Sequence, residues 1–218
     1  MTLSKELIAQ DLWNTMGVVD PDTGAPDLSP NDTIKAYGQG VLDMMTNSTC
    51  SFIAGGFRAV AAPPGSPIQG GDGAGGKLGG VVGSVLSSAV SSFLGPEAMV
   101  LAKLEHEAVA LYIQEAGLVS FATGSVTGTS TATGVNPGIL QLGTASAGKL
   151  SGLDGGAMYG RVLAATGSSG PNGKDFFTAL CDNLNRDTVI NFSSGTVVGI
   201  TTSSGQLTGG VGSGGKVS

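Results

Sequence analysis

Three glycine–lysine motifs have the residue types and the spacing of a known functional site. Each has the form GxxxxGK, which is the pattern of a phosphate-binding loop. The motifs span residues 71–77, 143–149 and 210–216. A phosphate-binding loop also needs a Ser or Thr directly after the lysine, because that hydroxyl holds the magnesium ion of the nucleotide. Here the lysine is followed by Leu in the first two motifs and by Val in the third. We therefore interpret the motifs as glycine-rich β turns that carry a lysine at the edge of a sheet.

The only histidine, His106, lies between two glutamates on a segment with helical periodicity. An HExxH zinc motif would need a second histidine, and a Ser-His-Asp or Cys-His arrangement would have to use His106 itself. No pattern directs a Ser or Cys at it, so we expect His106 to lie on a solvated helical face. Turn formation and capping explain the carboxylates in loops, which are Asp20, Asp22, Asp27, Asp32 and Asp154.

These observations predict a protein with no catalytic residues, no metal ligands and no cofactor. Cys50 and Cys181 have neither CxxC spacing nor a neighbouring histidine, so we expect both to be free buried thiols. The function is then expected to lie in surfaces, and the elements that build those surfaces decide what they present.

Composition limits both the core and the partners. The chain has 38 glycines and only 5% aromatic and 12% charged residues, so its core must be built mainly from small aliphatic side chains. A formal net charge of −6, with no run of three basic residues, argues against nucleic acid as a partner. No stretch of 18 apolar residues occurs, and we expect neither a membrane span nor a signal peptide.

A threefold internal repeat organises the chain. Windows 34–78, 106–150 and 173–217 align without a gap, and each ends in Gly-Lys followed by Leu or Val. The alignment matches three lysines and three columns of glycine: Lys77, Lys149 and Lys216; Gly56, Gly128 and Gly195; Gly71, Gly143 and Gly210; Gly76, Gly148 and Gly215. The pattern of each window predicts a helix followed by short Gly/Thr-rich strands.

The repeat predicts an α+β fold of three tandem small modules, with small-residue helices between them. The expected segments are an N-terminal helix and Pro/Asp-rich connector over 1–33, module 1 over 34–78, a helix pair with module 2 over 79–150, and a linker helix with module 3 over 151–218. In residues 81–94 apolar pairs alternate with Gly/Ser pairs, which favours close approach of another backbone. A helix over 96–116 is expected to begin at Pro96 and to stop at Gly117.

The N-terminal helix, expected over 4–16, lies outside the repeat. Two readings stay open: it docks on a partner, or it packs on the first module. If it docks, its apolar residues are candidate assembly contacts, namely Leu7, Leu12 and Trp13.

Two segments carry a resemblance to a known class of proteins. Helices of the type AVALYIQEAGLV (108–119) and FFTALCDNLNRDTVI (176–190) precede Thr/Gly-rich β tails, the last of which ends in GSGGKVS. This pattern covers most of 98–150 and 173–218, and it resembles the small virion structural proteins of tailed bacteriophages. The resemblance implies a non-enzymatic subunit of a tail, baseplate or neck, or of the capsid. Such a subunit would be made in the host cytoplasm and would pack in multiple copies, or against other structural proteins of the same particle, in a symmetric assembly.

An alternative remains beside the virion reading. A bacterial surface or adhesin-like repeat protein would share the Gly/Thr-rich tails, although it should also show a secretion signal and more regular strands. Under the virion reading Lys77, Lys149 and Lys216 are further candidate assembly contacts, because near-equal spacing presents one feature three times. The other explanation for these lysines is that each protects a sheet edge.

Overall fold

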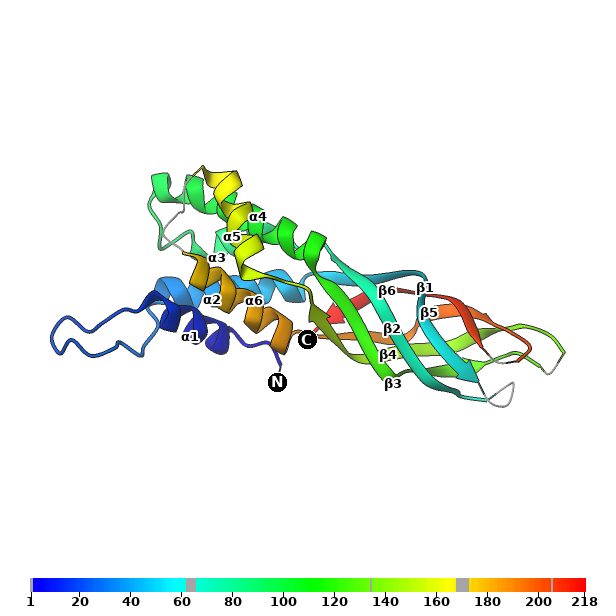
Figure 1. Ribbon diagram of the computed structural model, residues 1–218. Coiled ribbons are helices and arrows are strands. Elements are labelled where there is room, and N and C mark those ends of the chain that lie inside the picture. Colours follow the sequence, from blue (N-terminus) through cyan, green and yellow to red (C-terminus); the bar gives the residue numbers. More distant parts are fainter. Residues whose placement is uncertain (1, 62–65, 134, 168–172, 205) are drawn as a thin grey trace. The chain divides into compact units, whose positions relative to one another are not determined.

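The computed structural model of the chain describes residues 2–61, 66–133, 135–167, 173–204 and 206–218. Within these residues the chain forms six helices and six strands, in the order helix, helix, strand, strand, repeated three times (Figure 1). The helices form one unit and the strands another, so each unit draws on three separate segments. The helical unit comprises Met1–Asn47, Val81–Ala116 and Gly152–Thr188, and the barrel unit comprises Ser48–Gly80, Gly117–Ser151 and Val189–Ser218.

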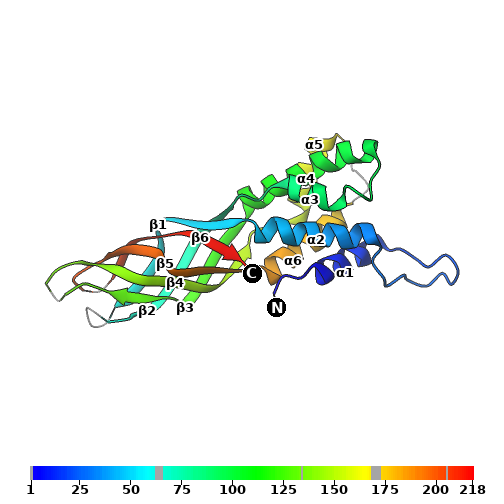
Figure 2. The same cartoon turned by 180° about the vertical axis from the view of Figure 1, so that it is seen from behind.

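The helical unit is a closed ring of helices. Each helix packs on its neighbours in the sequence order, and the last packs on the first; Figure 2 shows α2 between α1 and α3. Among the described residues, no helix combines the length and the apolar character needed to cross a membrane. The helices are α1 (Lys5–Met16), α2 (Asp32–Thr46), α3 (Gly83–Val90), α4 (Pro96–Ala116), α5 (Gly155–Thr166) and α6 (Lys174–Asp187).

Local signals set the helix ends, and several expected ends are confirmed. The Ser4 hydroxyl caps α1 by accepting a hydrogen bond from the Leu7 backbone N–H, and Gly17 ends the helix in the left-handed conformation. The helix α4 runs from Pro96 to the residue before Gly117, as expected. The small face expected for 81–94 also packs closely: a Cβ on Gly83 would come within 3.0 Å of the α4 backbone.

The barrel unit is a closed, six-stranded antiparallel sheet (Figures 1 and 2). Hairpins form between β1 and β2, β3 and β4, and β5 and β6, and neighbouring hairpins then join edge to edge. Closure comes from the pairing of β1 with β6. The strands are β1 (Thr49–Ala61), β2 (Ile68–Gly79), β3 (Leu118–Ser130), β4 (Gly138–Ser151), β5 (Val189–Thr201) and β6 (Leu207–Val217).

The expected architecture of three tandem modules is therefore wrong. Each β tail is a two-stranded hairpin with two unpaired edges, and an isolated hairpin of this kind is only marginally stable in water. The three hairpins satisfy these edges by pairing with one another, which leaves one barrel instead of three separate sheets. The helices likewise pack in one ring, including those expected to lie between modules.

The barrel core is a cluster of phenylalanines that follows the repeat. Phe52, Phe121 and Phe192 each lie three residues after the start of an odd-numbered strand, and all three are buried. Their ring centroids lie 5.7–5.8 Å apart, and Phe57 joins the cluster at 4.3 Å from Phe52. Each of these four rings thus packs against aromatic neighbours, mostly edge-on or tilted.

Glycines let the strands approach around this cluster. A Cβ on Gly76, Gly148 or Gly215 would come within 3.0 Å of the phenylalanine ring of its own hairpin. A second set, Gly71, Gly143 and Gly210, faces the next hairpin instead, where a Cβ would come within 3.0 Å of a backbone carbonyl oxygen. Any side chain at these positions would have to displace a ring or a neighbouring strand.

One strand offers a matched test of these requirements. Gly143→Ala should lower the free energy of unfolding by about 1–3 kcal/mol, because the new methyl overlaps the Val197 carbonyl. Ala147→Gly should raise it by about 1 kcal/mol, because Ala147 has φ 57° whereas its counterparts in the other repeats are glycines, Gly75 and Gly214. Urea unfolding followed by circular dichroism measures both changes.

Gly79→Ala is the control, since Gly79 is a strand glycine with nothing within 4 Å of an added Cβ. It should change stability little. If Gly143→Ala behaves like Gly79→Ala, the close approach of β4 and β5 does not constrain the barrel.

Candidate functional site

The structure places the three repeat lysines at equivalent positions on the barrel. Lys77 pairs with Ser51 across the first hairpin, Lys149 with Ser120 across the second, and Lys216 with Asn191 across the third. All three side chains are exposed. Since hairpins follow one another around a closed barrel, the lysines form a ring on its outer surface; we call this set the lysine ring.

The local sequence explains why the lysines point outward. Each is flanked by two buried residues, a glycine before it and Leu or Val after it. Successive strand residues face opposite sides of a sheet, so the residue between two inward positions must face solvent. A ring of ammonium groups is able to attract carboxylates on a partner, and threefold repetition adds the effect of multivalency to weak single contacts.

The GxxxxGK motifs themselves lie within the even-numbered strands β2, β4 and β6. No helix begins at the lysine in any of the three, so the N-terminal amides that would bind a phosphate are missing from these positions. The motifs are strand segments rather than turns, with glycines at the close strand contacts described above.

A second outward feature lies on β4 and β5. Ile139 and Ile200 are direct partners in the register, and Val198 lies on the same face of β5 as Ile200. These three side chains and Leu142 are 45–70% exposed. Together they form an apolar patch on the barrel surface, a feature typical of contact surfaces.

Leu142 has a strained backbone in addition. Its φ is 52°, and the corresponding positions in the other two repeats are glycines with φ near 60°, Gly70 and Gly209. The left-handed conformation costs a non-glycine residue roughly 1–2 kcal/mol. The second repeat thus keeps an exposed leucine at a position where its own backbone favours glycine.

The structure separates the candidate contacts on the N-terminal helix. Leu12 is fully buried, and Trp13 is buried with its indole N–H donating to the Asp27 carbonyl at 2.8 Å. Both belong to the core of the helical unit, which matches the reading that this helix packs on its own chain. Only Leu7, which is 37% exposed, reaches the surface.

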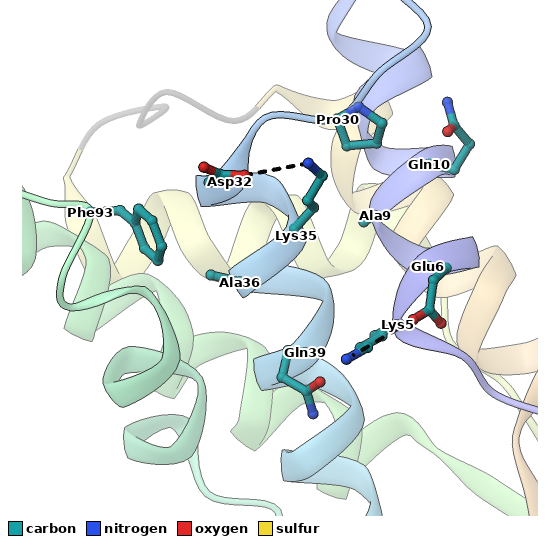
Figure 3. A pocket seen from close by; sticks show the side chains of 10 residues that line it. All are labelled: Lys5, Glu6, Ala9, Gln10, Pro30, Asp32, Lys35, Ala36, Gln39 and Phe93. Atoms are coloured by element: carbon teal, nitrogen blue, oxygen red, sulfur yellow. Dashed lines mark hydrogen bonds and ion pairs between the residues drawn. The ribbon is translucent and has the colours of Figure 1, made fainter.

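A surface groove of about 570 Å³ lies over α2 in the helical unit, between α1 and the segment that bears Phe93 (Figure 3). Its charged residues are paired with near neighbours: Lys35 with Asp32 at 3.3 Å and Lys5 with Glu6 at 4.0 Å. Because each charge is matched locally, the groove has no excess charge of either sign to select an ionic ligand.

His106 is buried, so the expectation of a solvated helical face is wrong. Its side chain is 2% exposed, and its ring lies edge-on to Tyr37 with centroids 5.6 Å apart. The ring Nδ1 lies 2.9 Å from the hydroxyl oxygen of Ser87 on α3, a pairing that no sequence motif indicated. Glu105, also buried, lies beside it. Three polar side chains are therefore clustered inside the helical ring.

The Ser87–His106 pair resembles a nucleophile and base only in its residue types. The Ser87 hydroxyl is also 3.1 Å from the Gly83 carbonyl, to which it donates. Burial lowers the pKa of His106 to about 4, so the ring is a weak base near neutral pH. A general base works best with a pKa near the operating pH, which this ring does not have. We therefore interpret the pair as a structural hydrogen bond between α3 and α4.

Cys50 and Cys181 are buried free thiols, and burial raises the pKa of each to about 12. A thiol with so high a pKa forms little thiolate and reacts slowly. In the part of the chain that the structure describes, no group of three or more His, Cys, Asp and Glu side chains is placed to hold a metal ion.

Comparison with known proteins found no matching family model, no matching curated protein and no matching solved structure.

The burial of His106 predicts a pH dependence of stability. The folded pKa of about 4 lies below the ordinary value near 6.5, so between these values the unfolded chain binds a proton that the folded chain does not. Stability should therefore fall as the pH drops from about 6.5 to about 4, by roughly 3 kcal/mol. Unfolding in urea at a series of pH values measures the slope.

His106→Asn is the matched variant, because an amide keeps a hydrogen-bonding group near Ser87 but does not titrate. Between pH 6.5 and pH 4 the variant should lose roughly 3 kcal/mol less unfolding free energy than the parent protein does. Equal slopes in both proteins would show that His106 is protonated as readily in the folded state as in the unfolded one.

Proposed function

We propose that this protein is a non-enzymatic structural subunit of a large assembly, a component of a bacteriophage virion that docks through the lysine ring on an acidic, symmetric partner. The observation that carries the proposal is the equivalent placement of Lys77, Lys149 and Lys216 in the three hairpin registers. A single chain thereby presents one charged feature three times around a closed barrel.

Repetition of this kind suits a partner with repeated subunits. Each carboxylate–lysine contact at a surface contributes about 0–1 kcal/mol, too little for a stable complex by itself. Three contacts on one rigid barrel add through effective concentration, because the first contact makes the next two intramolecular. The partner is then a ring or trimer of structural proteins with an acidic group on each subunit.

The apolar patch of β4 and β5 is a second, independent observation that supports an assembly role. Among the described residues, the pairing of two exposed isoleucines, Ile139 with Ile200, joins the second and third hairpins and has no equivalent in the printed registers between the other hairpins. The patch is therefore able to fix which way the barrel sits on a symmetric partner, which three equal lysines cannot do. An exposed leucine held in a strained backbone, Leu142, agrees with a residue kept for contact rather than for stability. Tail, baseplate and neck positions fit the proposal, and capsid-associated positions come next.

The first test is whether the protein is present in particles. Mass spectrometry of purified virions from the culture that carries this sequence should detect it in a fixed ratio to other structural proteins. Its absence from purified particles, together with its presence in the cell-surface fraction, would favour the adhesin-like alternative.

The second test removes the lysines one at a time and together. Changing Lys77, Lys149 and Lys216 to Ala should reduce incorporation into particles in steps, with a small loss for single variants and the largest loss for the triple variant. Quantitative mass spectrometry of particles that contain each variant measures the steps.

Changing Lys5, Lys35 and Lys174 to Ala is the control, since these three lysines are exposed on the helical unit and their removal changes the net charge equally. Incorporation should be kept in this control. Full incorporation of the triple lysine-ring variant would instead contradict docking through these residues.

A further inference from the structure

The helix α4 presents an apolar stripe to solvent in the helical unit. Val100, Leu104 and Leu111 are 63%, 45% and 41% exposed. At about 100° per residue these three positions fall within about 40° around the helix axis, so their side chains share one face. The helix packs on α3 and α5 within the ring, and this face is left open. An exposed apolar stripe on a helix is typical of a contact surface.

A groove of about 700 Å³ adjoins the stripe at Leu104, between α3 and α4; we call it the serine groove. Its α3 wall includes the exposed Ser84, Ser88 and Ser91. The Ser88 hydroxyl donates to the Ser84 carbonyl at 2.8 Å, and the Ser91 hydroxyl donates to the Ser88 carbonyl at 2.9 Å. Because these two hydroxyls already bond to their own helix, the wall needs no polar ligand. Its small side chains let another helix approach closely.

Two opposite charges flank the stripe on the side of the groove. Lys103 and Glu107 both line the groove, and both are exposed. In the part of the chain that the structure describes, neither residue belongs to an ion pair. The two lie one helical turn apart, so the face has a positive and a negative group side by side. This arrangement favours an occupant with the same two charges in reverse order over a simple anion or cation.

A second copy of the chain is such an occupant. If two copies of α4 lie antiparallel about a twofold axis near residue 105, Lys103 of each copy faces Glu107 of the other. Two equivalent ion pairs result. The same axis places Val100 of one copy near Leu111 of the other, since these positions lie at nearly equal distances from residue 105, and it places Leu104 beside its own counterpart. A twofold contact must be self-complementary, and this face meets that condition in both charge and apolar character.

We propose that the protein forms a twofold dimer through the α4 face, which consists of Val100, Lys103, Leu104, Glu107 and Leu111. The two copies of α4 lie antiparallel, each beside the serine groove of the other copy. This face belongs to the helical unit, whereas the lysine ring belongs to the barrel unit, so the dimer does not depend on docking through the lysines. One helix from each copy makes a small interface, and we expect a weak dimer with a Kd of roughly 1–100 µM.

Sedimentation velocity of the full purified chain tests the dimer without any particle. Between about 1 µM and about 1 mM protein, the sedimentation coefficient should rise from that of a monomer to that of a dimer, because this range spans the expected Kd. A monomer at every concentration would overturn the proposal.

Exchanging the charges tests the antiparallel arrangement. Lys103→Glu leaves carboxylates at both positions, and Glu107→Lys leaves ammonium groups at both, so each variant alone should lose dimer affinity by about tenfold or more. An equimolar mixture of the two variants should form a mixed dimer as well as the parent does, because every charge then meets its opposite. The double variant Lys103→Glu/Glu107→Lys should also dimerise like the parent. Unchanged dimers in the single variants, or no recovery in the mixture, would contradict the pairing.

Leu104→Ser tests the apolar part of the contact. It should weaken the dimer by about tenfold or more, because apolar area beside the axis is lost from both copies. Leu28→Ser is the control, since Leu28 is 71% exposed in the segment between α1 and α2, outside the α4 face. Circular dichroism checks that both variants are folded. Loss of the dimer in both variants, or in neither, would place the contact elsewhere.

Discussion

The close approach of neighbouring strands at a few glycines is the constraint on which the rest of the barrel depends. Six strands enclose a narrow core, and four phenylalanine rings already occupy it. At several glycines the strands approach these rings or the neighbouring backbone more closely than a side chain would allow. Each hairpin therefore places one glycine under its own phenylalanine and another against the backbone of the next hairpin. The glycines recur three times in the sequence because each of the three hairpins needs them at the same two places.

The same constraint fixes what the barrel presents outward. The residue after the glycine at 76, 148 or 215 must point away from the core, and in each case it is lysine. Deviations from the threefold pattern are equally informative. Phe57 adds a fourth ring to the core. Leu142 and Ala147 adopt the left-handed backbone conformation at positions where the other two repeats have glycine. Outward features therefore include one that repeats and one, the apolar patch, that does not.

Much of the local structure was predictable, because it depends on local signals. The start of α4 at Pro96 and its end before Gly117 followed from a favoured first-turn residue and a C-cap, and the glycines at 71, 143 and 210 were aligned correctly. The gap-free alignment failed in the first strand of each hairpin, because hairpin lengths differ: Phe52 precedes Lys77 by 25 residues, but Phe121 precedes Lys149 by 28. Gly56 and Gly128 were therefore matched wrongly. The equivalent glycines are Gly55, Gly124 and Gly195, with φ of 83–89°.

A shorter signal would have found this set, since Phe-x-x-Gly occurs at 52–55, 121–124 and 192–195. The joining of the hairpins and the burial of His106 were beyond local reasoning. Two glutamates beside a histidine suggest a solvated face, and only the ring of six helices covers it. Tyr37, Ser87 and His106 likewise lie on three different helices, and the hairpin of β1 and β2 separates Tyr37 from the other two in the sequence, so residue spacing did not indicate that they meet.

Zero-length carbodiimide cross-linking of intact particles, read by mass spectrometry, tests the central claim most directly. The reagent joins an ammonium to a carboxylate only when the two are in contact. If the lysine ring docks on a symmetric acidic partner, Lys77, Lys149 and Lys216 should each cross-link to the same acidic residue of one partner protein. Cross-links from the three lysines to unrelated proteins, or none from any of them while helical-unit lysines react, would contradict it.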